Sequence, residues 1–395
     1  MTALVDRLRR TPVLHLADQV LSSGTNFLAV VFVARNGTPQ QFGIFSIFLV
    51  VYYVATGFNR SVPHAIAMTL EWDDERSRSG YFFLPALVLG LVATLALVGT
   101  YSVVDPSWMF LPVFLLPLLV QDAVRMHAFA TQQPEVALVS DTVWLIVAGL
   151  GFLVASTSTG AAAAWAVGGV CALLVSRPWQ IRVRAQRRPI QAKVLSATLE
   201  YATLSGLGFL TPLLATPIIT LVGVGALQGS NVIRGPIILL IQGLLVHRMS
   251  GPPITPGNGM REALHLSGTT LAVTLACIPP LYLLRNVYGP RLLGATWPEV
   301  KPLVVPALCC MVIGSTAFGP ATVVRKMGRF SVSAKLQGAL VPVFVGLPLL
   351  GAVAAGPEGF LYATATAYAA FATAWWIVLP RLTGKPVARA DLAVT

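Results

Sequence analysis

The chain has 395 residues, of which 55% are hydrophobic and only 11% are charged. A soluble domain usually carries about 25% charged residues, so the composition indicates an integral membrane protein, in which each helix needs about 20 mostly apolar residues to cross the bilayer. The net charge of +12 does not indicate nucleic-acid binding, because the basic residues lie in short segments between apolar runs, where anionic lipid surfaces and the positive-inside rule place them.

Twelve apolar segments in succession are long enough to be membrane helices. The first contains Asp18, Gln19 and Asn26 and lacks a small-residue cleavage site, so it is interpreted as a retained span rather than a removed signal peptide. The connections are short, so neighbouring helices should mostly run antiparallel. The expected spans are 13–34, 42–60, 81–104, 108–128, 136–156, 160–177, 198–222, 228–248, 264–284, 302–324, 334–354 and 359–380.

The distribution of Lys and Arg predicts the orientation. With the N-terminus in the cytoplasm, the cytoplasmic segments hold 22 of these residues and the outer segments hold four, with Arg234 inside a span. Such a bias is the positive-inside pattern, so both termini are expected in the cytoplasm.

The densest basic run lies between the sixth and seventh spans and divides the chain into halves. Asp18-Gln-Val-Leu-Ser-Ser-Gly-Thr-Asn-Phe-Leu28 opens the first half, and Glu200-Tyr-Ala-Thr-Leu-Ser-Gly-Leu-Gly-Phe-Leu210 opens the second. This similarity predicts an all-α polytopic membrane protein of about 12 transmembrane helices in two six-helix lobes with parallel pseudo-two-fold symmetry; chance likeness between apolar helices is the alternative. The expected parts are an N-terminal lobe 1–177, a basic cytoplasmic linker 178–197, a C-terminal lobe 198–380 and a cytoplasmic tail 381–395.

Polar residues form a stripe on the otherwise apolar first span. At about 100° per residue they fall within one arc, which favours either a hydrogen-bonded seam between helices or a wet central cavity. Glu200 supplies a comparable acid in the second half, which favours the cavity. The stripe consists of His15, Asp18, Gln19, Ser22 and Asn26.

The eighth span carries Asn231, Arg234 and Gln242 on one face. Arg234 lies inside the span beside Gly235-Pro236, where proline should bend the helix and free carbonyl groups. A guanidinium facing a cavity suits a phosphate, which it can hold bidentately. The alternative is snorkelling of Arg234 to the outer surface.

Other ionisable residues lie nearer the cytoplasmic side. Arg60 and Arg125 are at helix ends, where they either anchor the protein or capture an anionic headgroup at the inner mouth. Asp122 is three residues from Arg125, so the two charges can neutralise each other. Asp141 is interpreted as either a buried structural hydrogen-bonding group or a proton site.

Several kinds of chemistry lack a signal. The four cysteines lie in apolar stretches without disulfide or metal-binding spacing, and neither a phosphate loop nor an HExxH motif is present. We therefore expect neither an enzyme nor a bound metal or cofactor. Tyr52, Tyr53 and Trp144 are candidates for stacking on sugars, but interfacial aromatic residues are common.

Two stretches resemble a known family. Asp18 to Leu28 followed by Ala34-Arg-Asn-Gly-Thr-Pro-Gln-Gln-Phe-Gly-Ile-Phe-Ser46 is similar to the first helix and following loop of the multidrug/oligosaccharidyl-lipid/polysaccharide exporter superfamily. Gln228-Gly-Ser-Asn-Val-Ile-Arg-Gly-Pro-Ile-Ile-Leu-Leu-Ile-Gln-Gly243 looks like the eighth helix of its actinobacterial members. Within the superfamily, the likeness is strongest to Wzx-type, or O-antigen, flippases.

The resemblance implies a multi-pass transporter of the bacterial plasma membrane. It would move a polyprenyl-(pyro)phosphate-linked oligosaccharide from the cytoplasmic to the outer leaflet by alternating access, during synthesis of cell-envelope polysaccharide. Its expected partners are membrane lipids, the lipid-linked oligosaccharide and a glycan polymerase or glycosyltransferases. The expected substrate-binding residues are Arg234, Asn231, Gln242, Arg60, Arg125 and Asn26, and the expected coupling residues are Asp18, Glu200, Asp141 and Asp122.

Two alternative functions remain open at this stage. A cation-coupled drug or metabolite exporter of the same fold is favoured by the acid in the first span, but Arg234 would repel a cationic cargo. A non-transporting membrane scaffold for an envelope-synthesis complex would not need ionisable residues inside the spans.

Overall fold

The computed structural model describes residues 12–69, 75–131, 133–181, 201, 207–249 and 256–383, and it has no β-strand among them. The chain divides into two compact units. The N-terminal unit comprises residues 1–194 and 291–296, and the C-terminal unit comprises residues 195–290 and 297–395. The expected fold class is confirmed: the chain is an all-α polytopic membrane protein with about a dozen membrane helices in two lobes.

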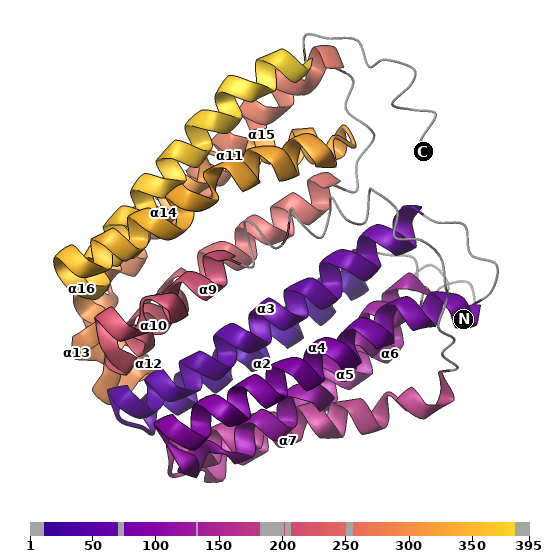
Figure 1. Cartoon of the computed structure of the whole chain (residues 1–395), viewed down its shortest axis with the longest axis vertical. Coiled ribbons are helices and arrows are strands. Elements are labelled where there is room, and N and C mark those ends of the chain that lie inside the picture. The colour runs from indigo at the N-terminus through magenta and orange to yellow at the C-terminus, as the bar shows by residue number, and fades with distance from the viewer. Residues whose placement is uncertain are drawn as a thin grey trace. The chain divides into compact units, whose positions relative to one another are not determined.

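Among the described residues, the N-terminal unit contains six long helices, and each corresponds to one expected span. Three of them begin with a proline, which suits the first helical turn because the backbone N–H lost there would have no helical acceptor. Figure 1 shows these helices lying side by side. They are α2 (Pro12–Arg35), α3 (Pro39–Thr69), α4 (Glu75–Val104), α5 (Phe110–Ala130), α6 (Pro134–Val154) and α7 (Ser158–Val175).

Two of these helices are longer than their apolar segments. Helix α3 continues to Thr69 instead of ending near residue 60, and α4 begins at Glu75 instead of near residue 81. The apolar parts are Pro39–Arg60 and Phe82–Val104. A helix satisfies its own backbone hydrogen bonds, so it can continue beyond the segment that hydropathy identifies.

The second half of the chain forms the remaining helices. Figure 1 labels them α9 to α16, from Leu207 toward the C-terminus. Short 3₁₀ turns separate several of them. The helices are α9 (Leu207–Leu214), α10 (Thr216–Met249), α11 (Gly259–Leu283), α12 (Arg285–Leu293), α13 (Trp297–Val300), α14 (Val304–Ser315), α15 (Phe318–Lys326) and α16 (Phe330–Thr383).

Two of these helices contain non-helical residues. Helix α16 contains the eleventh and twelfth spans, divided at Ala355 and Gly356. In α10 the non-helical residue is Thr220, and the helix continues through Pro236. Only part of the expected seventh span, 198–222, lies within the described residues.

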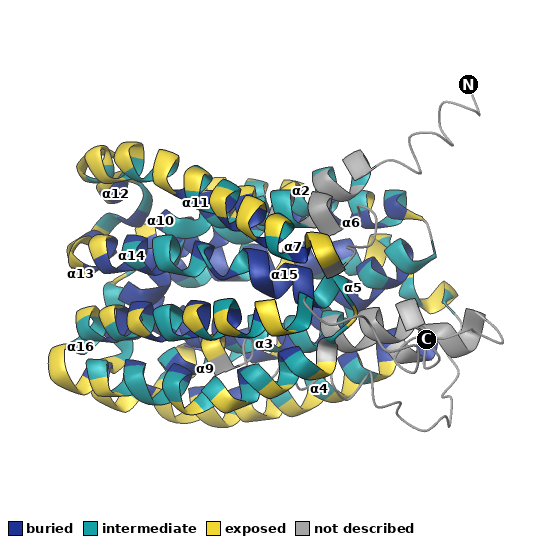
Figure 2. Cartoon of the chain, turned by 90° about the horizontal axis from the view of Figure 1, so that it is seen from above, coloured by how far each residue is buried: buried dark blue, intermediate teal, exposed yellow. Residues whose placement is uncertain are grey.

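The surface of the helices matches a lipid environment. Ten helical stretches among the described residues are long and apolar enough to cross a membrane. Helix α4 exposes a row of large apolar side chains, including Val88, Leu91, Val92 and Leu95, each at least 55% exposed. Figure 2 shows exposed residues along α4 and mostly buried residues along α15. Water would disfavour such apolar exposure, whereas lipid tails do not.

The expected tenth span is interrupted between α14 and α15. The backbone carbonyl of Ser315 accepts from Thr270 Oγ1 at 3.0 Å, and that of Thr316 accepts from Ser267 Oγ at 2.8 Å and from Trp376 Nε1 at 3.0 Å. Ser267 Oγ also accepts from the Gly319 N–H at 3.1 Å. Unpaired backbone groups are costly in a membrane, so side chains from α11 and α16 stabilise this interruption.

Substitution of Ser267 by alanine should therefore destabilise the protein by about 1–3 kcal/mol, because it removes the hydrogen bond of the buried Gly319 N–H and one of the two bonds to the partly buried Thr316 carbonyl. Thermal unfolding in detergent would measure the loss. Thr269→Ala is the matched control, because the exposed Thr269 hydroxyl bonds only to the carbonyl of His265 in its own helix. Equal effects of the two substitutions would contradict the assigned role of Ser267.

Candidate functional site

An aromatic core holds the helices around the polar residues of the N-terminal unit. Trp165 packs edge-on against Phe48 and Tyr52, and its Nε1 donates to Asn26 Oδ1 at 3.1 Å. The Trp144 indole donates to the backbone carbonyl of Trp165 at 2.8 Å. Trp144 is 2% exposed and Tyr52 is 3% exposed. This burial favours a packing role for Trp144 and Tyr52 over stacking on sugars.

Arg125 is the centre of a buried ionic cluster inside this unit. Its Nε lies 2.7 Å from Asp18 Oδ2 and 3.2 Å from Asp141 Oδ2, and its Nη2 also pairs with Asp18. The side chains of Arg125, Asp18 and Asp141 are 3%, 0% and 1% exposed. Helices α2, α5 and α6 each contribute one member, so the cluster joins three helices.

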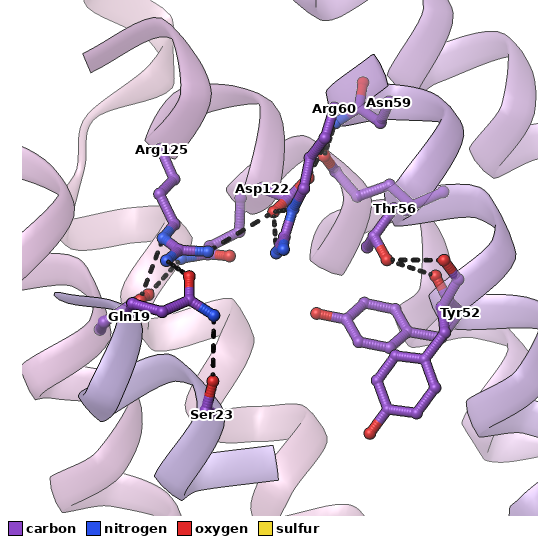
Figure 3. Close-up of polar contacts among 12 residues, drawn as sticks. Gln19, Ser23, Tyr52, Thr56, Asn59, Arg60, Asp122 and Arg125 are labelled. Carbon is purple, nitrogen blue, oxygen red and sulfur yellow. Dashed lines mark hydrogen bonds and ion pairs between the residues drawn. The ribbon is translucent and has the colours of Figure 1, made fainter. Parts of the chain in front are cut away.

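A third carboxylate links this centre to a second guanidinium. Arg60 Nη2 and Nε lie 2.7 and 2.9 Å from Asp122 Oδ1, and Arg125 Nη1 lies 4.0 Å from the same oxygen. Asn59 Nδ2 donates to Asp122 Oδ2 at 3.2 Å. Figure 3 shows Arg60 and Arg125 on opposite sides of Asp122, with Arg125 also reaching Gln19. Arg60 is the more exposed of the two arginines, at 38% of its side chain.

Neutral polar groups complete the cluster. Gln121 Nε2 donates to Asp141 Oδ1 at 3.0 Å and to Ser140 Oγ at 3.1 Å, and Ser140 in turn donates to the carbonyl of Ala172. Gln121 and Ser140 were missed by the sequence reasoning, as was Asn59. For Gln121 and Ser140 the available signal was their position next to an acid, because Gln121 directly precedes Asp122 and Ser140 directly precedes Asp141.

The cluster is not electrically balanced when all its members are ionised. Arg60 and Arg125 provide two positive charges, whereas Asp18, Asp122 and Asp141 provide three negative charges. Asp18 Oδ1 is buried without a hydrogen-bond donor among the described residues. A buried uncompensated charge is costly, so this arrangement favours the uptake of one positive charge.

A separate polar group lies in the C-terminal unit. Arg234 Nη2 donates to Asn231 Oδ1, and Asn231 Nδ2 donates to Gln228 Oε1 at 3.0 Å. Arg234 Nε is buried without an acceptor, and no carboxylate forms an ion pair with Arg234 within the described part of the chain. Within the described residues, the guanidinium therefore retains unused donors, and no carboxylate balances its positive charge.

The other expected site residues are placed only in part. Glu200 and the start of its span lie outside the described residues, and Gln242 is placed in α10 without a described side chain. A surface cavity of about 390 Å³ lies at the start of α11 and is lined by Asn258, Arg261, Glu262 and His265. It contains none of the expected site residues.

No family model matches the chain, and no curated protein matches it. Solved structures do match. An inward-facing multidrug-resistance transporter of the MATE family and MOP superfamily shares a TM-score of 0.66 at 12% identity, over 94% of both chains. A MATE protein in a bent conformation gives a TM-score of 0.63 at 13% identity, over 95% of this chain and 96% of that one.

The fold is also similar to that of a lipid II flippase. MurJ in an inward closed conformation gives a TM-score of 0.63 at 10% identity, over 93% of this chain and 87% of that chain. The likeness to MATE proteins and to MurJ therefore extends along nearly the whole chain. At these identities the likeness establishes the fold alone.

Proposed function

We propose that this protein is a membrane transporter that flips a polyprenyl-(pyro)phosphate-linked oligosaccharide from the cytoplasmic to the outer leaflet by alternating access. The observation that carries the proposal is Arg234. It is a guanidinium within a membrane helix, with its Nε buried and unpartnered and with no carboxylate to neutralise it among the described residues. A cation in a span usually marks a substrate path or a partner.

The chemistry of a phosphate-linked lipid suits this arrangement. A guanidinium presents a planar set of donors that matches phosphate oxygens bidentately, and Asn231 and Gln228 place amide groups beside it for sugar hydroxyls. The lipid tail of such a cargo would remain in the bilayer. The similarity of the fold to MATE transporters and to the MurJ flippase supports transport of this general kind, and it requires no enzyme chemistry.

The cellular setting follows from the same proposal. The protein would lie in a bacterial plasma membrane with both termini in the cytoplasm, as the distribution of Lys and Arg predicts. It would act with the enzymes that make or polymerise the glycan. The ionic cluster of Asp18, Asp122, Asp141, Arg60 and Arg125 would couple transport to a cation and would not contact cargo, because each arginine is already paired with a carboxylate.

Deletion of the gene should cause a lipid-linked oligosaccharide to accumulate in the inner leaflet, and the wild-type chain should restore export. Arg234→Ala should restore about tenfold to hundredfold less, the equivalent of losing about 1.5–3 kcal/mol of charge-assisted hydrogen bonding. Arg234→Lys should recover part of the activity, because it keeps the charge without the bidentate geometry. Accumulated lipid-linked glycan and surface glycan are the measurements.

Arg285→Ala is the matched control for this experiment, since Arg285 stacks on Tyr282 and bonds to the carbonyl of Tyr282 in the same unit. It should restore export fully. Each variant has to reach the membrane in wild-type amounts. Full rescue by Arg234→Ala would contradict the proposed contact with phosphate, and unchanged glycans in the deletion strain would exclude this cargo.

A second candidate function is a cation-coupled drug or metabolite exporter. The net negative cluster in the N-terminal unit favours it, because such a cluster provides a binding place for a coupling cation. The same deletion strain separates the two candidates. Increased sensitivity to drugs with unchanged glycans would support the exporter, whereas accumulation of lipid-linked glycan with unchanged drug sensitivity would support the flippase.

A further inference from the structure

We propose that Arg125 acts as a resident cation that excludes metal ions from the Asp18–Asp141 pair, so that the ion bound by the N-terminal unit is a proton. This inference rests on the proposed function only for the consequence that the bound ion drives transport. The ion preference itself follows from the contacts around Arg125 and can be tested without cargo.

The Arg125 guanidinium lies beside two carboxylates from different helices. Arg125 Nε faces both Asp18 Oδ2, at 2.7 Å, and Asp141 Oδ2, at 3.2 Å. Two carboxylates from different helices would ordinarily repel each other, and a cation between them removes the repulsion. In this chain a side chain already provides that cation. A metal ion would have to displace a guanidinium that is 97% buried, since its exposed fraction is 3%.

The surroundings of Asp18 and Asp141 offer few oxygen ligands for a metal ion. Hard metal cations take about six or more oxygen ligands, and the described residues contain no group of three His, Cys, Asp or Glu that could hold a metal ion. Beside the pair, Gln19 Oε1 already accepts from Arg125 Nη2 at 3.3 Å. Gln121 Nε2 already donates to Asp141 Oδ1, so the free ligand capacity is confined to very few oxygens.

The ionic cluster has a net charge that a proton can neutralise. Besides Arg125, the charged and titratable groups near the pair are Arg60 and the buried Tyr52 from α3 and Asp122 from α5, which contacts both arginines (Figure 3). With all carboxylates ionised the cluster carries one excess negative charge. A single proton neutralises it and requires only one oxygen.

Two buried carboxylate oxygens are available to take up this proton. Asp18 Oδ1 and Asp141 Oδ2 are both buried and make no hydrogen bond among the described residues, although Arg125 Nε lies 3.2 Å from Asp141 Oδ2 and bonds to the other oxygen of Asp18. A proton on either oxygen removes the excess negative charge and turns an acceptor that lacks a donor into a hydrogen-bond donor. Arg125 therefore acts as a specificity-determining residue, which leaves room for a proton and none for a metal ion.

The test uses the purified full-length chain in detergent. Thermal unfolding is compared in sodium chloride and in choline chloride at equal ionic strength, and difference infrared spectroscopy follows the C=O stretch of a protonated carboxyl as the pH is raised. The wild type should melt at the same temperature in both salts. It should show one protonated carboxyl band that disappears on deprotonation and is missing from Asp18→Asn/Asp141→Asn.

The variants assign the selectivity to Arg125. Arg125→Ala should gain a sodium-dependent rise in melting temperature of several degrees, because the carboxylates then face an empty space. Arg125→Lys should remain insensitive to sodium, as should Arg125→Ala combined with Asp18→Asn and Asp141→Asn. If Arg125→Ala does not fold, the wild-type and Arg125→Lys measurements still decide the question.

A wild type that is stabilised by sodium, with the effect removed by Asp18→Asn, would overturn the proposal, as would the absence of a protonated carboxyl band. These outcomes do not depend on glycan export. Export lost on deletion together with sodium binding by the wild type would overturn the inference and leave the proposed function standing. Unchanged glycans in the deletion strain, together with a cluster that is protonated and insensitive to sodium, would overturn the proposed function and leave this inference standing.

Discussion

Replacement of Arg125 by methionine should destabilise the protein by about 3–5 kcal/mol, because it leaves Asp18 and Asp141 as buried carboxylates without their shared cation. Methionine keeps much of the side-chain volume, so the loss reports the charge more than the packing. Chemical unfolding of the purified protein would measure it. The effect should be among the largest of any single substitution in the N-terminal unit.

Two further variants separate charge from packing. Arg125→Met combined with Asp18→Asn and Asp141→Asn should recover most of the stability, because neutral amides need no cation. Arg60→Met is the matched control and should cost less, since the Arg60 side chain is 38% exposed and its ion pair among the described residues is with Asp122. A triple variant that is as unstable as the single variant would show that Arg125 contributes mainly through packing.

Substitution of Gly319 by alanine should also be strongly destabilising, by about 3 kcal/mol or more. A Cβ atom at Gly319 would lie 2.1 Å from the backbone oxygen of Ala263 and 2.4 Å from Ser267 Oγ. Backbone cannot move aside as a flexible side chain can, so α11 and α15 would have to separate, and overpacking of this kind is costly. The same separation would weaken the hydrogen bonds of Ser267 to Thr316 and Gly319.

Thermal unfolding of Gly319→Ala beside Gly268→Ala tests this prediction. Gly268 lies in α11, and a Cβ atom there would meet nothing within 4 Å. Alanine is the better helix former, so Gly268→Ala should be neutral or slightly stabilising. A Gly319→Ala protein as stable as the wild type would mean that the close approach of α11 and α15 is not a requirement of the fold.

The helices themselves were largely predictable from the sequence. The apolar segments 108–128 and 136–156 correspond to α5 and α6 within a few residues. Hydropathy finds such spans because each must match the thickness of the bilayer by itself. It does not find the helix ends that project beyond the apolar part, such as the continuation of α3 to Thr69.

The candidate site was predictable only as a set of separate residues. Asp18, Asp122, Arg125 and Asp141 each stand out because ionisable groups are rare inside spans. Their partners do not stand out, since Asp18 and Arg125 are 107 positions apart in the chain. The spacing of Asp122 and Arg125 suggested that these two neutralise each other, yet Arg125 lies nearer to Asp18 and Asp141.

The sequence by itself thus determined that the chain is a membrane protein of about a dozen helices, and which few polar residues enter the apolar segments. Both properties are local, because every span has to satisfy its own backbone and its own contact with lipid. Only the tertiary structure decided that Arg125 is enclosed by carboxylates, whereas Arg234 has none beside it among the described residues. Charge compensation depends on which helices pack together and in what register, and the periodicity of a single helix does not specify either one.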